Sequence, residues 1–205
     1  MLKNALEAPK KAFEQFPPQV RIFLLRGLVL FALWKLLYLF IWAQPRTLDG
    51  PLTNAVGRQS VWMLNKIYNT DGFKATPVIA VTRMEGEYQV AKVSKIDKNG
   101  KHLLNIADDC NGLELFILYI GFILSMPATF KRKALYFFGG VLIIHLVNLL
   151  RCVGLSALLM HWDRYFDLAH HYIFKIMVYS TIFVLWVRFS NNLSVFKSSH
   201  EPVQK

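Results

Sequence analysis

Long apolar runs alternate with polar segments along most of the chain. A helix needs roughly 17 to 25 mainly apolar residues to cross a bilayer core of about 30 Å, because each residue rises about 1.5 Å. The pattern therefore predicts an all-α integral membrane protein with about four transmembrane helices. The apolar runs are residues 22–43, 113–129, 134–160 and 172–190.

A long polar segment, residues 44–112, separates the first run from the second. Within it, residues 54–68 carry apolar side chains at helical spacing, which predicts an amphipathic helix on the membrane surface. Two strand-like runs, PVIAVTRM and EYQVAKVSKI, flank Glu85-Gly86 and predict a β-hairpin, and HLLNIADD adds a third strand. The segment is too short to bury a sizeable core alone, so we expect a small β-hairpin/α insertion that packs on the helices or on the membrane.

The transmembrane domain with this insertion covers residues 21–190. Pro17 and Pro18 separate it from a polar and aromatic lead-in, residues 1–20, where we expect a cytoplasmic surface helix. Residues 191–205 form a cytoplasmic tail.

Composition and charge agree with a membrane protein. Hydrophobic residues make up 54% of the chain, more than a soluble domain usually carries, and the formal net charge is +11. Basic residues gather before the first run, after the last, and in the connection Lys131-Arg132-Lys133, and the positive-inside rule assigns such segments to the cytoplasm. We therefore expect both termini inside, residues 44–112 outside, and no nucleic-acid partner.

This topology brings three chemically different side chains to one depth. Cys110 immediately precedes the second run, and His170 and His171 open the fourth, both of which begin outside. Arg151 lies roughly 26 Å along the third run, which begins inside. A thiol, a guanidinium and an imidazole are therefore expected together near the outer interface.

These three groups are suited to nucleophilic catalysis. An imidazole can take the proton of a thiol or stabilise the thiolate, which is the nucleophilic form. A guanidinium supplies fixed donors for an oxyanion or a carboxylate. An arginine inside an apolar run is costly in lipid and is usually paired or functional. A membrane cysteine protease or transpeptidase could be built from these parts.

Three short motifs connect this set to a known family. They are D-C-N-G at 109–112, N-L-L-R at 148–151 and A-H-H-Y-I-F at 169–174. In their order, spacing and topology the chain resembles the exosortase and archaeosortase family of polytopic membrane cysteine enzymes. The likeness covers roughly residues 105–190, and the strand-rich segment before it resembles that of short Bacteroidetes-type members. Larger members have about eight spans, so a substrate groove built by additional helices is not expected here.

The resemblance implies a role for each residue of the set. Cys110 would be the nucleophile, Arg151 a group that positions the substrate or stabilises the transition state, and His170 the general acid and base, with His171 as the alternative to His170. Supporting roles are expected for Asn148, Asp109, Gly112 and Glu114.

The resemblance also implies a substrate class and a location. Substrates would be membrane-anchored proteins whose C-terminal sorting signal consists of a short motif, one membrane helix and a basic tail. Cleavage would form a thioester on Cys110, which an amine, a hydroxyl or water would resolve. The site would face the periplasm from the bacterial inner membrane. Its partners would be the lipid bilayer and, in some cases, a small membrane protein encoded nearby. No metal or organic cofactor is implied.

Two other classes of protein stay open on the residues alone. A membrane thiol-disulfide oxidoreductase could use Cys110 and Cys152, although the chain has no CxxC pair. We expect Cys152 to be a packing residue instead, because it points about 100° away from Arg151 around the helix. A non-enzymatic membrane assembly factor would use the polar residues only to bind partner helices.

Overall fold

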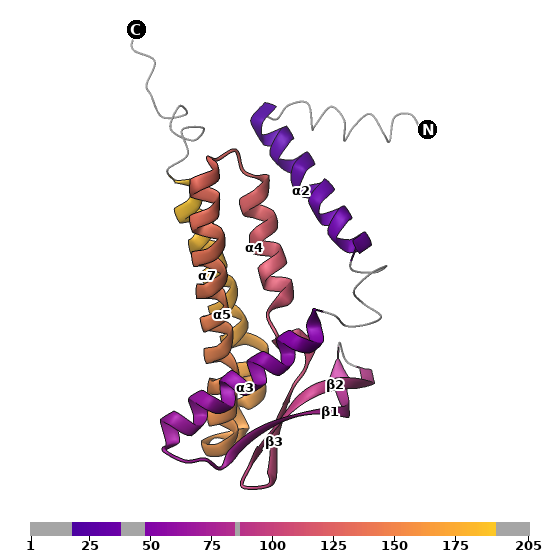
Figure 1. Cartoon of the computed structure of the whole chain (residues 1–205), viewed down its shortest axis with the longest axis vertical. Coiled ribbons are helices and arrows are strands. Elements are labelled where there is room, and N and C mark those ends of the chain that lie inside the picture. Colours follow the sequence, from indigo (N-terminus) through magenta and orange to yellow (C-terminus); the bar gives the residue numbers. More distant parts are fainter. Residues whose placement is uncertain (1–17, 38–47, 85–86, 192–205) are drawn as a thin grey trace.

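The computed structural model describes residues 18–37, 48–84 and 87–191, and all statements below refer to these residues. The long helices are α2 (Pro18–Leu37), α3 (Asp49–Tyr68), α4 (Leu113–Ser125), α5 (Phe130–His161) and α7 (Phe174–Ser190). The strands are β1 (Phe73–Met84), β2 (Glu87–Lys98) and β3 (Lys101–Ile106). Short helices are η2 (Asp108–Cys110), η3 (Asp163–Tyr165), α6 (Phe166–Leu168) and the π-helix η4 (Ala169–Ile173). Helices α4, α5 and α7 pack side by side, α2 contacts α4, and α3 with the sheet lies across one end of them (Figure 1).

Two helical stretches in the described part of the chain are long and apolar enough to cross a membrane. They are α5 and the stretch Asp163–Ser190, which runs through η3, α6 and η4 into α7. The runs 134–160 and 172–190 that the sequence predicts lie inside them. Each helix begins earlier than predicted, because polar and aromatic residues at its mouth continue the helix.

The helix predicted over 113–129 is shorter in the structure. Helix α4 begins at Leu113 as predicted but ends at Ser125, so its 13 residues rise about 20 Å, less than a bilayer core. The backbone of Met126 is extended, as expected for a residue that precedes a proline, here Pro127. An apolar run therefore overestimated the helix by one turn.

The span predicted over 22–43 lies only partly within the described residues. Helix α2 includes residues 22–37 of this span. Its three basic residues, Arg21, Arg26 and Lys35, make it too polar to count with the two stretches that are long and apolar enough to cross a membrane. The four-span arrangement therefore stays a prediction. The surface helix predicted in the lead-in and the cytoplasmic tail fall almost wholly outside the described residues.

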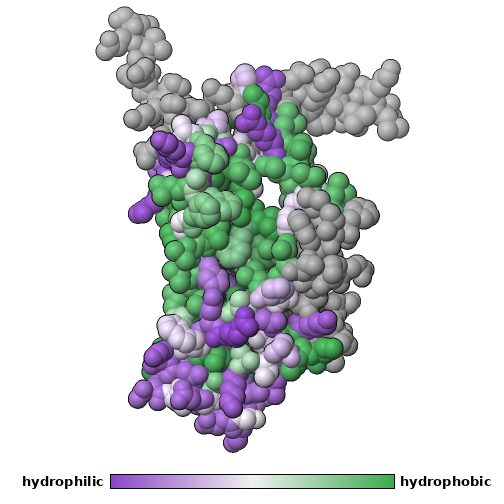
Figure 2. Space-filling model, in the orientation of Figure 1, coloured by the Kyte–Doolittle hydropathy of each residue, from purple (hydrophilic) through white to green (hydrophobic). Residues whose placement is uncertain are grey.

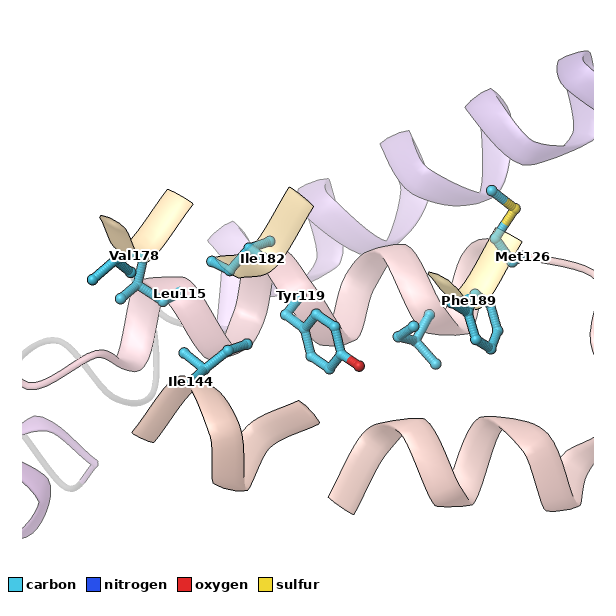
Figure 3. Packing of buried hydrophobic residues seen from close by; sticks show 8 residues of the cluster. Leu115, Tyr119, Met126, Ile144, Val178, Ile182 and Phe189 are labelled. Carbon is cyan, nitrogen blue, oxygen red and sulfur yellow. The ribbon is translucent and has the colours of Figure 1, made fainter. Parts of the chain in front are cut away.

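The three packed helices share a stripe of buried side chains (Figure 3). Leu115, Tyr119 and Ile123 follow one face of α4 at four-residue spacing and meet residues of α5 and α7. Gly140 of α5 lies directly against the Tyr119 ring, where a Cβ would collide with it, and the Tyr119 hydroxyl donates to the carbonyl of Tyr136 at 2.8 Å. Close van der Waals packing of this kind holds helices together in lipid, where burial of apolar surface between helices gains little.

The insertion between α2 and α4 forms a separate layer of α3 and the sheet. Its strands are antiparallel in the order β1-β2-β3, which confirms the predicted hairpin and third strand. Val56 and Leu64 on one face of α3 are fully buried, and Gly57 lets α3 approach Ser94 of β2 closely. The amphipathic helix predicted over 54–68 is confirmed as part of α3, and the insertion packs on the helices as expected.

Hydropathy divides the molecule in the same way (Figure 2). Hydrophobic residues cover the visible surface over the packed helices, and hydrophilic residues cover the layer formed by α3 and the sheet. Large apolar side chains on α5 and α7, including Phe138, Leu142 and Phe183, are more than half exposed. Such a surface requires lipid or a partner around the helices.

Candidate active site

The turn that carries Cys110 connects the polar layer to the helices. Cys110 ends η2, and Asn111 and Gly112 lead directly into α4. Gly112 has φ +87°, a conformation that costs side-chain-bearing residues roughly 1–2 kcal/mol, and its added Cβ would lie 3.2 Å from Nδ2 of Asn148. Glycine is therefore required both by the turn and by the close approach of α5.

Asn111 fixes this turn in three directions. Its Oδ1 accepts from the N–H of Leu113 at 2.8 Å, so the side chain caps the first turn of α4. Its Nδ2 donates to Oδ1 of Asp49 at 3.0 Å and to Oγ1 of Thr53 at 3.3 Å, both at the start of α3. Thr53 in turn donates to Oδ1 of Asp108 at 2.8 Å. The first turn of α3 thereby holds the segment that carries the thiol.

Helix α5 contributes the polar groups that face Cys110. Asn148 is fully buried and its Nδ2 donates to the Cys110 carbonyl at 2.9 Å. Arg151, one turn later on the same face, is 7% exposed and places Nη2 3.6 Å from the Cys110 Sγ. The sequence-predicted thiol and guanidinium are thus in direct contact across 41 positions of the chain.

Cys110 itself is half-buried, and its surroundings act in opposite directions on its acidity. Burial is the largest effect and raises the pKa of the thiol above its usual value. The charge of Arg151 opposes this and lowers the pKa, whereas the carboxylate of Asp109 raises it further. The thiol therefore stays neutral at neutral pH and needs a base to become nucleophilic.

His170 enters from the last helical stretch. It lies in the π-helix η4, and single π-turns of this kind occur frequently at functional sites. Its side chain is half-buried, stacks on Phe166 with 5.6 Å between ring centroids, and lies near enough to Arg151 for their charges to interact. One turn beyond it, Phe174 packs where a Cβ on Gly154 would come within 2.7 Å, so the faces that carry Arg151 and His170 lie close together.

The two adjacent histidines differ in burial. His171 is exposed, whereas His170 is half-buried beside the arginine. No hydrogen bond joins His170 to Cys110 among the described residues. Catalytic hydrogen bonds are often long or absent without substrate and tighten when a substrate binds.

The other expected supporting residues are divided between two places. Asn148 and Gly112 lie at the thiol, whereas Glu114 and Asp109 are exposed and line a small cavity with Lys35 of α2. Within the described residues no ion pair joins Glu114 to Arg151. Glu114, the second residue of α4, therefore does not neutralise the arginine.

Two residues at the site carried no sequence signal, and a third, Cys152, was expected only to pack. Asp49 and Thr53 belong to a helix recognisable only by its apolar face, and their polar contacts to the turn depend on how α3 packs. Cys152, expected to be a packing residue, is 2% exposed and packs with Val56, but its Sγ also lies 3.9 Å from the Cys110 carbonyl.

Two buried polar atoms at the site have no partner within the described part of the chain. They are Nε of Arg151 and Oδ1 of Asn148. Buried polar groups are nearly always paired in folded proteins, and an unpaired N–H beside a nucleophile can bind a substrate carbonyl or a developing oxyanion. The arrangement provides a thiol, a buried cation with a donor to spare, and a nearby imidazole.

The fold and the site together define a membrane protein with a cysteine-arginine-histidine site at the end of its apolar helices. The family model for transmembrane exosortases matches residues 21–188, and the chain belongs to this family. The match includes α3 and the sheet, and so extends well beyond the motifs that carried the resemblance. Comparisons with curated proteins and with solved structures give no match.

Proposed function

We propose that the protein is a cysteine transpeptidase or peptidase that cleaves the C-terminal sorting signals of membrane-anchored proteins. Membership of the transmembrane exosortase family supports a sorting-related role of this type. The observation that carries the residue assignment is the contact of 3.6 Å between Nη2 of Arg151 and the Cys110 Sγ. Burying a guanidinium without a carboxylate partner costs free energy. Beside a thiol, however, its charge can stabilise the thiolate or the oxyanion that forms during the reaction.

The reaction begins with His170 taking the proton of Cys110. The thiolate attacks the carbonyl carbon of the scissile peptide bond, and the carbonyl π electrons move onto oxygen, where Arg151 stabilises the resulting negative charge. Collapse of this intermediate breaks the C–N bond, and His170-H⁺ gives its proton to the leaving amine. The product is a thioester on Cys110, which an amine, a hydroxyl or water attacks as His170 accepts the incoming proton. Collapse of this second intermediate breaks the C–S bond and releases the acyl product, and His170-H⁺ returns its proton to the Cys110 thiolate.

Topology supports a site on the periplasmic side of the inner membrane. The basic residues Lys131-Arg132-Lys133 lie in the first turn of α5, at the connection from α4, whereas Cys110 precedes α4 and Arg151 lies toward the other end of α5. The positive-inside rule therefore favours a cytoplasmic location for that connection and an outer location for the site, α3 and the sheet. The proposed arrangement of four spans with both termini in the cytoplasm agrees with this assignment.

A cleavage assay tests the proposed function. The reporter is an exported domain followed by a short polar motif, an apolar span and a basic tail, taken from a protein of the bacterium that encodes the enzyme. Wild type should shorten it in membranes, and Cys110→Ala and Cys110→Ser should not. Equal shortening by wild type and Cys110→Ala would exclude Cys110 as the nucleophile.

The adjacent histidines provide a matched pair of variants for the base. His170→Gln should abolish cleavage, whereas His171→Gln should retain it, because only His170 lies half-buried beside Arg151. Both glutamines keep a hydrogen-bonding group of similar reach without an imidazole. The reverse result would transfer the role of base to His171.

A further inference from the structure

A cavity of about 500 Å³ runs between α2, α4 and α7. Most of its wall is apolar or aromatic, and Phe31, Leu118 and Trp186 represent the three helices that line it. Figure 2 shows an opening in the hydrophobic surface beside α2. We call this cavity the α2–α4 groove.

Small residues shape the groove. Helices α2 and α4 meet where Gly27 faces Ser125, since a Cβ on Gly27 would lie 3.7 Å from the Ser125 Oγ. One turn nearer the site, a Cβ on Gly121 would meet no atom within 4 Å, although Gly121 lines the cavity. The groove is thus closed near the basic end of α4 and open from Gly121 toward Glu114, over a length of about 10 Å.

The open end of the groove leads to a polar cavity next to the segment that carries Cys110. A second cavity of about 90 Å³ shares Trp34, Lys35, Glu114 and Ile117 with it and is also lined by Asp109, the neighbour of Cys110. The wall therefore changes from apolar to polar at the depth of the thiol. An occupant of the groove must be apolar along α4 and must leave the apolar region beside Cys110.

We propose that the α2–α4 groove receives the outer end of the apolar membrane helix of the substrate protein, about two turns, and presents the residues outside that helix to Cys110. This inference rests on the proposed function and assigns the substrate a place in it. A lipid chain would match the apolar wall but not its continuity with a polar cavity at a nucleophile. Among the described residues that line the second cavity, four carboxylates (Asp49, Asp108, Asp109 and Glu114) accompany one ammonium, that of Lys35, which favours a basic or amide-bearing residue on the substrate there.

Photo-crosslinking tests the position of the substrate helix. A p-benzoylphenylalanine replaces Leu118 in the groove or Leu146 on α5 outside it, two leucines of matched exposure at 46% and 49%. Both are made in a Cys110→Ala background so that the reporter described above stays intact. Leu118 should yield at least about tenfold more reporter adduct than Leu146. Equal yields, or adducts with lipid alone at Leu118, would overturn the proposal.

Filling the groove provides a second test. Gly121→Leu should lower reporter cleavage by wild-type enzyme about tenfold or more without changing alkylation of Cys110, because it occupies the space of the substrate helix. Gly139→Leu is the control, since a Cβ there also meets nothing within 4 Å and Gly139 lies outside the groove. Equal cleavage by the two variants would count against the groove.

The outcomes separate this inference from the proposed function. Cleavage by wild type without a selective adduct at Leu118 refutes the groove and leaves the function standing. A selective adduct without cleavage supports the groove and refutes the function. Absence of both cleavage and adduct refutes the two together, because the inference rests on the function.

Discussion

The contact between Arg151 and Cys110 gives the most direct test of the proposed chemistry. Arg151→Gln keeps a side chain of similar length and removes the positive charge. A unit charge 3.6 Å from a second one interacts by about 4 to 5 kcal/mol at an effective dielectric constant near 20. This is an upper figure, because Cys110 is half-buried and water screens part of the interaction.

The loss of rate should follow from that charge. Removing a comparable oxyanion-stabilising donor in other enzymes slows reaction roughly 100- to 1,000-fold, or about 2.7–4 kcal/mol, which lies within the electrostatic figure. We therefore expect Arg151→Gln to slow reporter cleavage by that factor. Arg151→Lys should lose less, because it keeps the charge but not the planar fork of donors.

The assay is single-turnover cleavage of the reporter in detergent or vesicles, with the amount of folded enzyme measured for each variant. Folding should persist in Arg151→Gln, since no carboxylate among the described residues pairs with Arg151 and loss of a buried unpaired charge is not expected to destabilise. A folded Arg151→Gln enzyme within about threefold of the wild-type rate would refute the role of Arg151 in the reaction.

Three further variants test the neighbours of the thiol. Asn148→Leu removes the amide donor to the Cys110 carbonyl and leaves it only the weak Cys152 thiol, at a cost of about 1 kcal/mol. It should lower both the unfolding temperature and single-turnover cleavage, and an unchanged rate would contradict a positioning role. Asp109→Asn removes a carboxylate that raises the thiol pKa, so the pKa should fall and alkylation of Cys110 should reach half its maximal rate at lower pH than in wild type. Cys152→Ala should cost about 1 kcal/mol of stability and keep cleavage, whereas lost activity would favour the thiol-disulfide alternative.

Periodicity along the chain was sufficient to predict the elements. Alternation over 77–96 predicted the hairpin, and unbroken apolar runs predicted α5 and the last helix, because local spacing of apolar residues governs both. The residues at which helices end were harder to predict. Pro127 and the extended residue before it end α4 early, and a hydropathy pattern does not register that local backbone restriction.

The sequence by itself determined which residue types could do chemistry and, through the charge of the connections, predicted that three of them share one depth of the membrane. That Arg151 touches the Cys110 thiol, that His170 rather than His171 lies beside the arginine, and that Asn111 ties the turn to Asp49 were decided only by the tertiary structure. The physical reason is that the depth of a residue in the membrane follows from its distance along a helix. Which side chains contact one another depends instead on how each helix is rotated about its axis and on how closely the helices pack. Gly112 and Gly154 allow that packing, and what they contact is visible only once the helices are assembled.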